Sequence, residues 1–218
     1  MVGKPYRYVL HAILFLLLTG SVWGKYHAVI MPVDKTVKQR MLKGHSWHEG
    51  CPVHYQNLRY LTMTYIDFSG KERTGEMIVH KTVAKEVTGI FKKLYKSGYP
   101  IRQMHLVSDF GGSDWKSIDA DNTSAFNCRN ATGSKKWSKH SYGRAIDLNP
   151  LENPYISRNG HITHKASFQY RKRVHRNKSA EDRAVLLRND EAVKIFKAYG
   201  WQWGGDWHGV KDYQHFSK

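Results

Sequence analysis

The sequence lacks the features that would place it outside the globular proteins. Gly and Pro number 18 and 6 among 218 residues, and no internal repeat is visible, so a disordered or repetitive chain is excluded. The amino-terminal apolar run, residues 9–18, falls short of the roughly 20 residues that a membrane-spanning helix needs. The length instead fits one domain with a sizeable core.

The amino terminus has the layout of a secretory signal peptide. Lys4 and Arg7 precede the apolar run, and small residues, among them Gly24, follow it. The sequence therefore predicts a signal peptide over residues 1–24, cleaved after Gly24, with an uncleaved membrane anchor as the alternative. No cysteine lies near the end of this segment, which argues against a lipoprotein anchor.

Acidic residues are scarce. Eighteen Asp and Glu stand against 35 Lys and Arg, and the formal net charge is +17. Because residues 1–24 contain two basic and no acidic side chains, the remainder still carries +15. Such a field attracts anionic polymers or surfaces: nucleic acid, cell-wall polymers or anionic lipids. Charge alone does not choose among them, but no nucleic-acid recognition motif is present.

Cysteine is also scarce, since only Cys51 and Cys128 occur. In an exported chain, an even count favours a disulfide over two separate buried thiols. Such a bridge would stabilise the fold by about 4 kcal/mol in the chain-entropy model.

Hydrophobic patterning predicts an α+β fold in a single domain with a small antiparallel sheet flanked by helices. The predicted elements are a β-hairpin over 58–68 and 74–79, a helix over 83–94 capped by Thr82, strands over 101–107 and 142–148, and a helix over 191–199. Residues 25–50 are predicted to be an irregular basic lead-in, and residues 51–218 to be the functional domain.

Two further stretches lack helical or strand periodicity. Residues 109–139 are rich in Gly, Ser, Asp and Asn, and a segment of this length inside a compact domain is functional or mobile as a rule. Residues 151–180 are predicted to be loop-like.

Residues 138–147 and 204–216 contain the side-chain types that a hydrolytic metal site requires. Zinc in such a site takes three protein ligands, and a carboxylate near the bound water accepts its proton. His140, Asp147 and His215 could supply the ligands and Asp212 the carboxylate. On spacing alone, the pattern leaves both a metal site and ordinary solvated histidines open, because the chain has 13 histidines.

The motifs add a resemblance. The string S-x-H-x-x-G-x-A-x-D at residues 138–147, with W-G-G-D-W and D-x-x-H-F within 203–216, resembles the D-alanyl-D-alanine carboxypeptidase and L-alanyl-D-glutamate endopeptidase family. Residues 50–53, 122–129 and 153–154 are similar to its VanY-like, carboxypeptidase-like branch. The resemblance implies a zinc site in a central cleft of the domain.

The resemblance also implies residue roles. His140, Asp147 and His215 match the zinc ligands, and Asp212 matches the general base. Arg129 is similar in placement to an arginine that steadies the substrate carbonyl or the oxyanion.

The remaining site residues are assigned to the substrate. Ser138, Trp207 and His208 are expected to contact it, and His208 is also the main rival metal ligand. Asp206 is expected to have a structural role. Trp201, Trp203 and Trp207 could line the cleft, but at least one of the three is expected to pack in the core.

Together these observations predict an exported zinc peptidase that cuts peptidoglycan stem peptides, of the D-alanyl-D-alanine carboxypeptidase type. An exported chain would be periplasmic, cell-wall-associated or secreted. The alternatives are an L-alanyl-D-glutamate endopeptidase, a non-catalytic zinc-containing wall-binding module and, on charge alone, a nucleic-acid binder.

Overall fold

The computed structural model describes residues 24–175 and 179–218, so the predicted signal peptide lies almost entirely outside the described residues. The helices are α1 Lys35–Lys43, α2 Ala84–Lys96, α3 Asp114–Asp119, α4 Ala180–Ala184 and α5 Glu191–Ala198. The strands are β1 Ala28–Pro32, β2 Leu58–Ile66, β3 Glu72–His80, β4 Ala145–Asp147, β5 Tyr155–Ile156, β6 Gln202–Trp203, β7 Lys211–Asp212 and β8 His215–Ser217. These elements confirm the α+β class.

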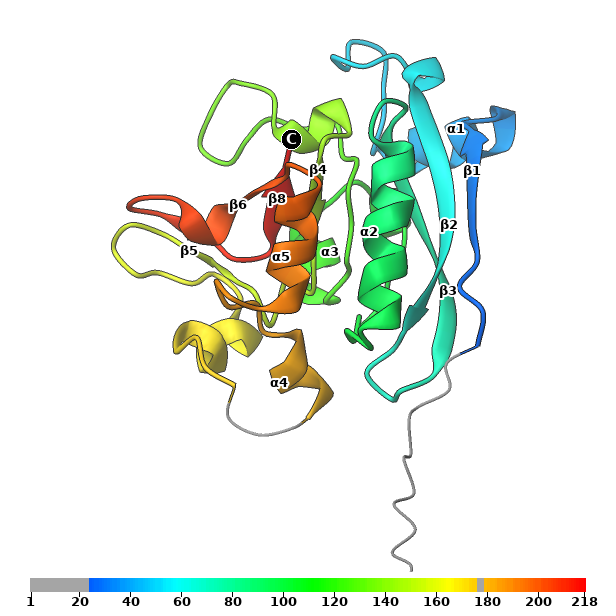
Figure 1. The fold of residues 1–218 in the computed structure, drawn as a ribbon. Coiled ribbons are helices and arrows are strands. Elements are labelled where there is room, and N and C mark those ends of the chain that lie inside the picture. Colours follow the sequence, from blue (N-terminus) through cyan, green and yellow to red (C-terminus); the bar gives the residue numbers. More distant parts are fainter. Residues whose placement is uncertain (1–23, 176–178) are drawn as a thin grey trace, which may run out of the picture.

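The strands form three small antiparallel sheets where the sequence predicted one. Their orders are β1–β2–β3, β4–β8–β6 and β5–β7. In Figure 1, α2 lies against the first sheet, and α5 lies beside α2 in front of the second. The two larger sheets and these two helices therefore enclose the main core.

The predicted hairpin is present as β2 and β3. Its turn is organised by Asp67, whose Oδ1 accepts hydrogen bonds from the backbone N–H groups of Ser69 and Lys71. Side chains alternate across the hairpin, so that Leu61 and Met77 enter the main core beneath α2. The opposite face packs on a second apolar cluster, whose members include Met41, Trp47, Leu58, Ile78 and Phe126.

The β4–β8 pairing determines which side chains reach the candidate site. Ile146 is paired with Phe216, and both side chains are fully buried in the main core, where the Phe216 ring stacks on Phe196 at 3.8 Å. The next pair in the register is Asp147 with His215. Because successive strand residues point to opposite faces, this pair lies on the face turned away from the core.

The prediction of irregular structure for residues 25–50 is wrong, because β1 and α1 lie there. All five residues of β1 are exposed, so the strand has no alternating pattern and is held by its backbone pairing with β2. In α1 only Met41 is fully buried, and the helix begins at Asp34, whose side chain accepts from Val37 N–H at 2.8 Å.

Two other local predictions differ from the structure. The segment 101–107 is not a strand: it makes one isolated bridge, Gln103 with Asn122, and buries Ile101 and Met104 in the core without regular pairing. Helix α2 is preceded by Val83 rather than capped by Thr82, whose hydroxyl instead accepts from Arg144.

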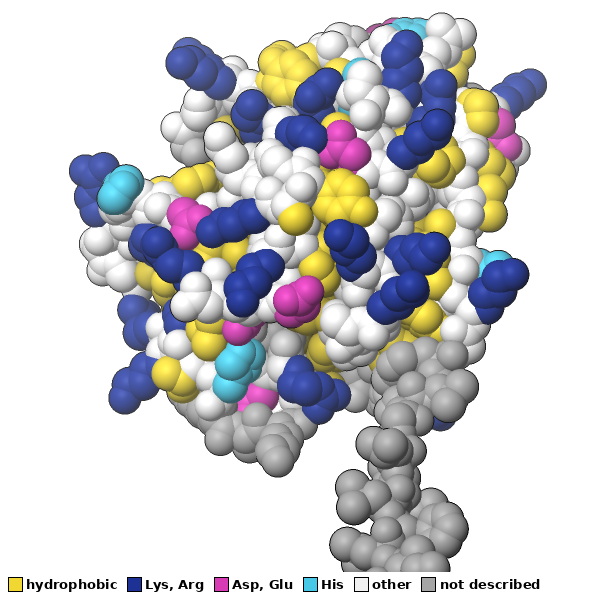
Figure 2. All heavy atoms as spheres, in the orientation of Figure 1, with side chains coloured by type: hydrophobic (Ala, Val, Ile, Leu, Met, Phe, Trp, Pro, Cys, Tyr) yellow, Lys and Arg dark blue, Asp and Glu magenta, His cyan; other side chains and the backbone are white. Residues whose placement is uncertain are grey.

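Basic side chains cover the face on which α2 and α5 lie, with few acidic ones between them (Figure 2). Helix α2 alone exposes four lysines, at positions 85, 92, 93 and 96. Within residues 24–175 and 179–218, no helix combines the length and apolar character that crossing a membrane requires.

The disulfide between Cys51 and Cys128 is confirmed. Cys128 is buried in the second apolar cluster, and its backbone N–H donates to Ser46 O at 2.9 Å. The bridge therefore ties the chain before the hairpin to the segment that leads directly into Arg129.

A buried carboxyl pair lies under the turn at residues 149–153. Glu152 and Asp121 are each 3% exposed, and Arg173 holds the turn by donating to the Glu152 carbonyl at 2.5 Å. Burial, and then the neighbouring Asp121 carboxylate, raise the pKa of Glu152 to about 9. Glu152 is therefore a neutral acid in the folded protein at neutral pH.

We expect loss of the disulfide to weaken the fold. Replacing both Cys51 and Cys128 by Ser should lower the free energy of unfolding by about 2–4 kcal/mol, because the unfolded chain gains freedom. Urea denaturation followed by circular dichroism measures this. Dithiothreitol should weaken the wild type similarly and leave the double variant unchanged; equal midpoints for oxidised and reduced wild type would contradict the expectation.

Glu152 should make stability fall as pH rises. Its pKa is higher in the folded than in the unfolded chain, so the folded state binds the extra proton, and this contribution is lost between about pH 5 and 9. Glu152→Gln, whose amide can donate to Asp121, should match the wild type near pH 4 and exceed it by about 1 kcal/mol or more at pH 9.

Thermal denaturation over this pH range checks the expectation for Glu152. The exposed Glu49→Gln serves as the matched control and should follow the wild type at every pH. A difference between Glu152→Gln and the wild type that stays constant with pH would show that the proton is not involved.

Candidate metal centre

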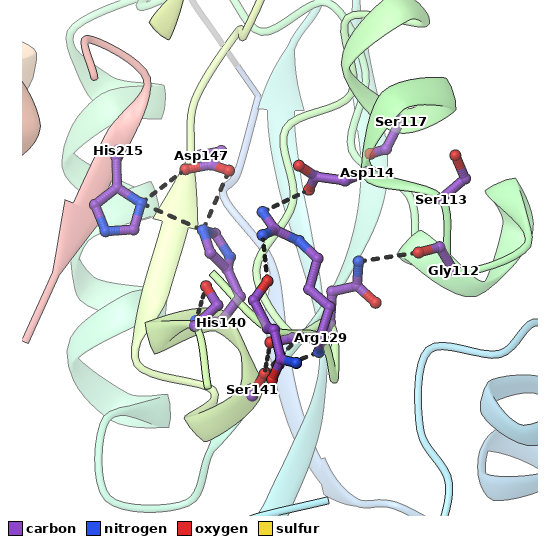
Figure 3. Close-up of polar contacts among 12 residues, drawn as sticks. Gly112, Ser113, Asp114, Ser117, Arg129, His140, Ser141, Asp147 and His215 are labelled. Atoms are coloured by element: carbon purple, nitrogen blue, oxygen red, sulfur yellow. Dashed lines mark hydrogen bonds and ion pairs between the residues drawn. The ribbon is translucent and has the colours of Figure 1, made fainter. Parts of the chain in front are cut away.

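His140, Asp147 and His215 converge, with their side chains pointing toward one another (Figure 3). His140 Nε2 lies 3.2 Å from Asp147 Oδ2, and His215 Nδ1 lies 3.1 Å from Asp147 Oδ1. The two ring nitrogens are 3.3 Å apart. All three side chains are buried, with exposures of 4%, 6% and 7%.

The sequence around His140 explains its position. His140 lies in the 3₁₀ helix Lys139–Tyr142, which begins at Ser138, whose hydroxyl accepts from His140 N–H at 3.3 Å. The helix ends at Gly143, which has a φ of +63°. A side chain there would be strained, and its Cβ would lie 2.6 Å from His80 N. Glycine therefore allows the chain to turn from His140 into β4.

A hydrogen bond orients the His140 ring. Its Nδ1 lies 2.5 Å from Ala125 O. Since a carbonyl oxygen only accepts, Nδ1 carries a proton, and Nε2 is the ring nitrogen that faces Asp147 and His215 and could ligate a metal. A backbone carbonyl bound to the distal ring nitrogen is the usual support of a metal-ligating histidine.

The electrostatics of the three residues favour an ionised carboxylate. Burial alone would raise the pKa of Asp147, but the adjacent His140 and His215 rings hold it below its ordinary value. Burial would lower the pKa of His140, and the Asp147 carboxylate outweighs this and raises it. The cluster thus combines an anionic carboxylate with two imidazole rings.

The three donors fit a zinc ion. Two imidazole nitrogens and one carboxylate are a donor set of catalytic zinc, which keeps its fourth position for water. The facing ring nitrogens and both Asp147 oxygens point into the same space, which a cation would occupy favourably. Exposed His208 is not a member of this cluster, so the rival ligand set is not supported among the described residues.

Asp212 reaches the same cleft from β7. This strand pairs with β5, with Asp212 opposite Tyr155, so its position comes from a short strand rather than a helical turn. Gly204 permits this approach, because a Cβ there would overlap the Asp212 carbonyl oxygen. Burial, and then the Asp147 carboxylate, raise the pKa of Asp212 to about 6. Among the described residues, its buried Oδ1 has no hydrogen-bond partner.

The cluster opens into a cleft of about 580 Å³. Arg129, Ser138 and Trp207 line this cleft, and their roles toward a substrate stay predictions. The ring centroids of Trp207 and His215 are 5.4 Å apart. His208 is exposed beside Trp207 and is not among the lining residues, so its expected substrate contact is not evident in the described part of the chain.

Several lining residues were not singled out from the sequence. They are Asp114, Trp115, Trp137, Tyr155 and His164. Trp115 and Trp137 are 52% and 37% exposed, and the Trp115 ring packs on His164 at 4.1 Å. Both tryptophans lie in the non-periodic segment 109–139, whose length was the only sequence signal for them.

The expected structural residues behave as predicted. Trp201 and Trp203 are buried in the main core. Asp206 forms ion pairs with Arg188 at 3.2 Å and Lys197 at 2.6 Å. None of the three lines the cleft.

Comparison with known proteins agrees with this geometry. No curated protein and no solved structure matches the chain. A family profile described as D-alanyl-D-alanine carboxypeptidase matches residues 132–218. The matched region contains His140, Asp147, Asp212 and His215, and it excludes Arg129. Residues 132–218 therefore match the D-alanyl-D-alanine carboxypeptidase family of peptidases, the family that the sequence motifs resemble.

Proposed function

We propose that the protein is a zinc-dependent peptidase that hydrolyses peptidoglycan stem peptides as a D-alanyl-D-alanine carboxypeptidase. At the family level, the profile match supports a peptidase that acts on peptidoglycan. The observation that carries the proposal is the buried cluster of His140, Asp147 and His215, with Asp212 lining the same cleft.

The roles of the residues follow from their positions. Zinc bound by His140, Asp147 and His215 would supply a Lewis acid and lower the pKa of a coordinated water. Asp212 accepts a proton from the attacking water and returns it to the leaving amine. Arg129 donates hydrogen bonds to the substrate oxygen on which negative charge develops.

Positive charge in the cleft supports an anionic stem peptide as the substrate. A substrate ending in D-alanine brings a terminal carboxylate, which needs a cationic partner. Arg129 and Lys139 both line the cleft. We assign the substrate contacts to Ser138 and Trp207, with His208 at the exposed margin. L-alanyl-D-glutamate cleavage is the alternative outcome of the test below.

The disulfide also bears on where in the cell the protein acts. The disulfide between Cys51 and Cys128 favours an oxidising compartment, which supports export through the predicted signal peptide. Export would bring the net charge of +15 close to anionic wall polymers, which we propose as secondary partners rather than as the substrate.

We expect one zinc ion to bind at the cluster. His140→Ala or His215→Ala should weaken zinc binding by about 100-fold or more, because each removes one of three protein ligands. Titration calorimetry of the metal-free protein measures this. His208→Ala is the matched control and should keep the wild-type affinity. Equal affinity in the His140 and His208 variants would contradict the ligand assignment.

Turnover should depend on Asp212. Asp212→Asn should keep zinc affinity and lower kcat by about 10²–10⁴-fold, because the proton acceptor is lost. Mass spectrometry of defined muropeptides incubated with the zinc-loaded protein should show loss of a terminal D-alanine. Asp206→Asn, at an aspartate outside the cleft, is the control and should retain turnover.

The same experiment separates the alternatives. Fragments cut after L-alanine would indicate the endopeptidase. If the zinc-loaded wild type binds muropeptides but cuts none of them, and Asp212→Asn behaves identically, the protein is a wall-binding module. Binding to DNA without binding to cell walls would indicate the nucleic-acid binder.

A further inference from the structure

The backbone of Arg129 is fastened to the segment that carries His140. Ser141, which follows His140 and is fully buried, accepts from Arg129 N–H at 2.9 Å and donates to Arg129 O at 2.6 Å. Ser138 N–H also donates to Arg129 O at 3.1 Å. The Cα atom of Arg129 is therefore held at a fixed place relative to the metal ligand.

The guanidinium group of Arg129 is held separately. Its Nη2 lies 2.8 Å from Asp114 Oδ1, and its Nη1 donates to Asn130 O at 3.1 Å (Figure 3). Guanidinium has five N–H donors, so these two contacts leave three N–H groups for a ligand. One of them is on Nε, which is buried and has no partner within residues 24–175 and 179–218.

Hydrogen bonds hold the part of the chain that contains Asp114. It is the first residue of α3, and the preceding Ser113 accepts from Lys116 N–H at 3.3 Å. The Asn127 side chain donates to Gly112 O at 3.1 Å, so the loop before α3 is tied to the segment that ends at Arg129. The carboxylate is thus presented to Arg129 from a second, independently held element.

The ion pair has little value for folding. The Arg129 and Asp114 side chains are 24% and 36% exposed, and pairs at this exposure contribute little net stability. Both residues nevertheless line the cleft that contains His140 and Asp147. The pair is therefore better explained by the direction that it gives to the guanidinium than by stabilisation of the fold.

We propose that Asp114 is a positioning residue: it holds the Arg129 guanidinium so that its unused N–H groups face the anionic oxygen of the substrate. The inference rests on the proposed function of Arg129. Without Asp114, the long Arg129 side chain samples other rotamers, and the aligned fraction of donors falls.

A double-mutant cycle tests this role. Asp114→Ala should lower kcat/KM about ten- to hundredfold, with most of the loss in kcat, because a misplaced group acts mainly on the reacting state. The same change in an Arg129→Ala background should have no further effect. Asp114→Asn, which keeps the Oδ1 acceptor, should recover part of the loss. Equal losses from Asp114→Ala in both backgrounds, or unchanged turnover, would overturn the proposal.

A matched control separates positioning from general damage. Asp109 pairs with Arg40 at 2.6 Å at similar exposure and does not line the cleft. Asp109→Ala should leave kcat/KM unchanged, and Asp114→Ala should leave the melting temperature within a few degrees of the wild type. A loss of turnover that tracks the melting temperature across both variants would overturn the proposal.

A measurement that does not depend on turnover separates the positioning role of Asp114 from the proposed peptidase function. The Nε–H signal of Arg129, identified by its loss in Arg129→Lys, should show a rigid heteronuclear NOE in the wild type and a flexible one in Asp114→Ala. A signal that stays rigid in Asp114→Ala overturns the positioning role. If the wild type cuts no muropeptide, the proposed function fails, whatever the mobility of Arg129.

Discussion

The antiparallel pairing of β4 with β8 is the constraint on which the candidate site depends. Its register sets Asp147 opposite His215 and Ile146 opposite Phe216. The apolar pair is buried against α5, where Phe216 stacks on Phe196, so the core fixes the register. A slip by one residue would turn the candidate ligands Asp147 and His215 into the core and the apolar pair into the cleft. Hydrophobic packing on one face thus holds the candidate metal ligands on the other.

The rest of the site is assembled on this pair from separate segments. His140 lies in a 3₁₀ helix that ends at Gly143, and the carbonyl oxygen of Ala125 orients its ring. Asp212 lies on β7, and Arg129 directly follows the disulfide-bonded Cys128. Ala125, Cys128 and Arg129 precede the region that matches the carboxypeptidase family, so the candidate metal centre is supported by structure from the earlier part of the chain. Neither part forms the cleft alone.

Sequence patterns succeeded where side chains carry the signal. The hairpin and the two amphipathic helices were predicted because alternation and 3.6-residue periodicity follow directly from burial on one face. The patterns failed for β1, which is exposed along its length and depends on backbone hydrogen bonds to β2. They also failed for residues 101–107, where apolar side chains are buried without strand pairing. In both cases the structure of the segment depends on its contacts with another part of the chain, which its own residue pattern does not encode.

For the candidate site, the sequence by itself determined which residues to consider: His140, Asp147, His215 and Asp212 are of the types that metal hydrolysis requires, and the motif orders them along the chain. Only the tertiary structure decided that the first three lie within 3.3 Å of one another, that exposed His208 is not with them, and that Asp114 meets Arg129. The physical reason is that convergence depends on strand register and core packing between distant residues, which no local pattern encodes.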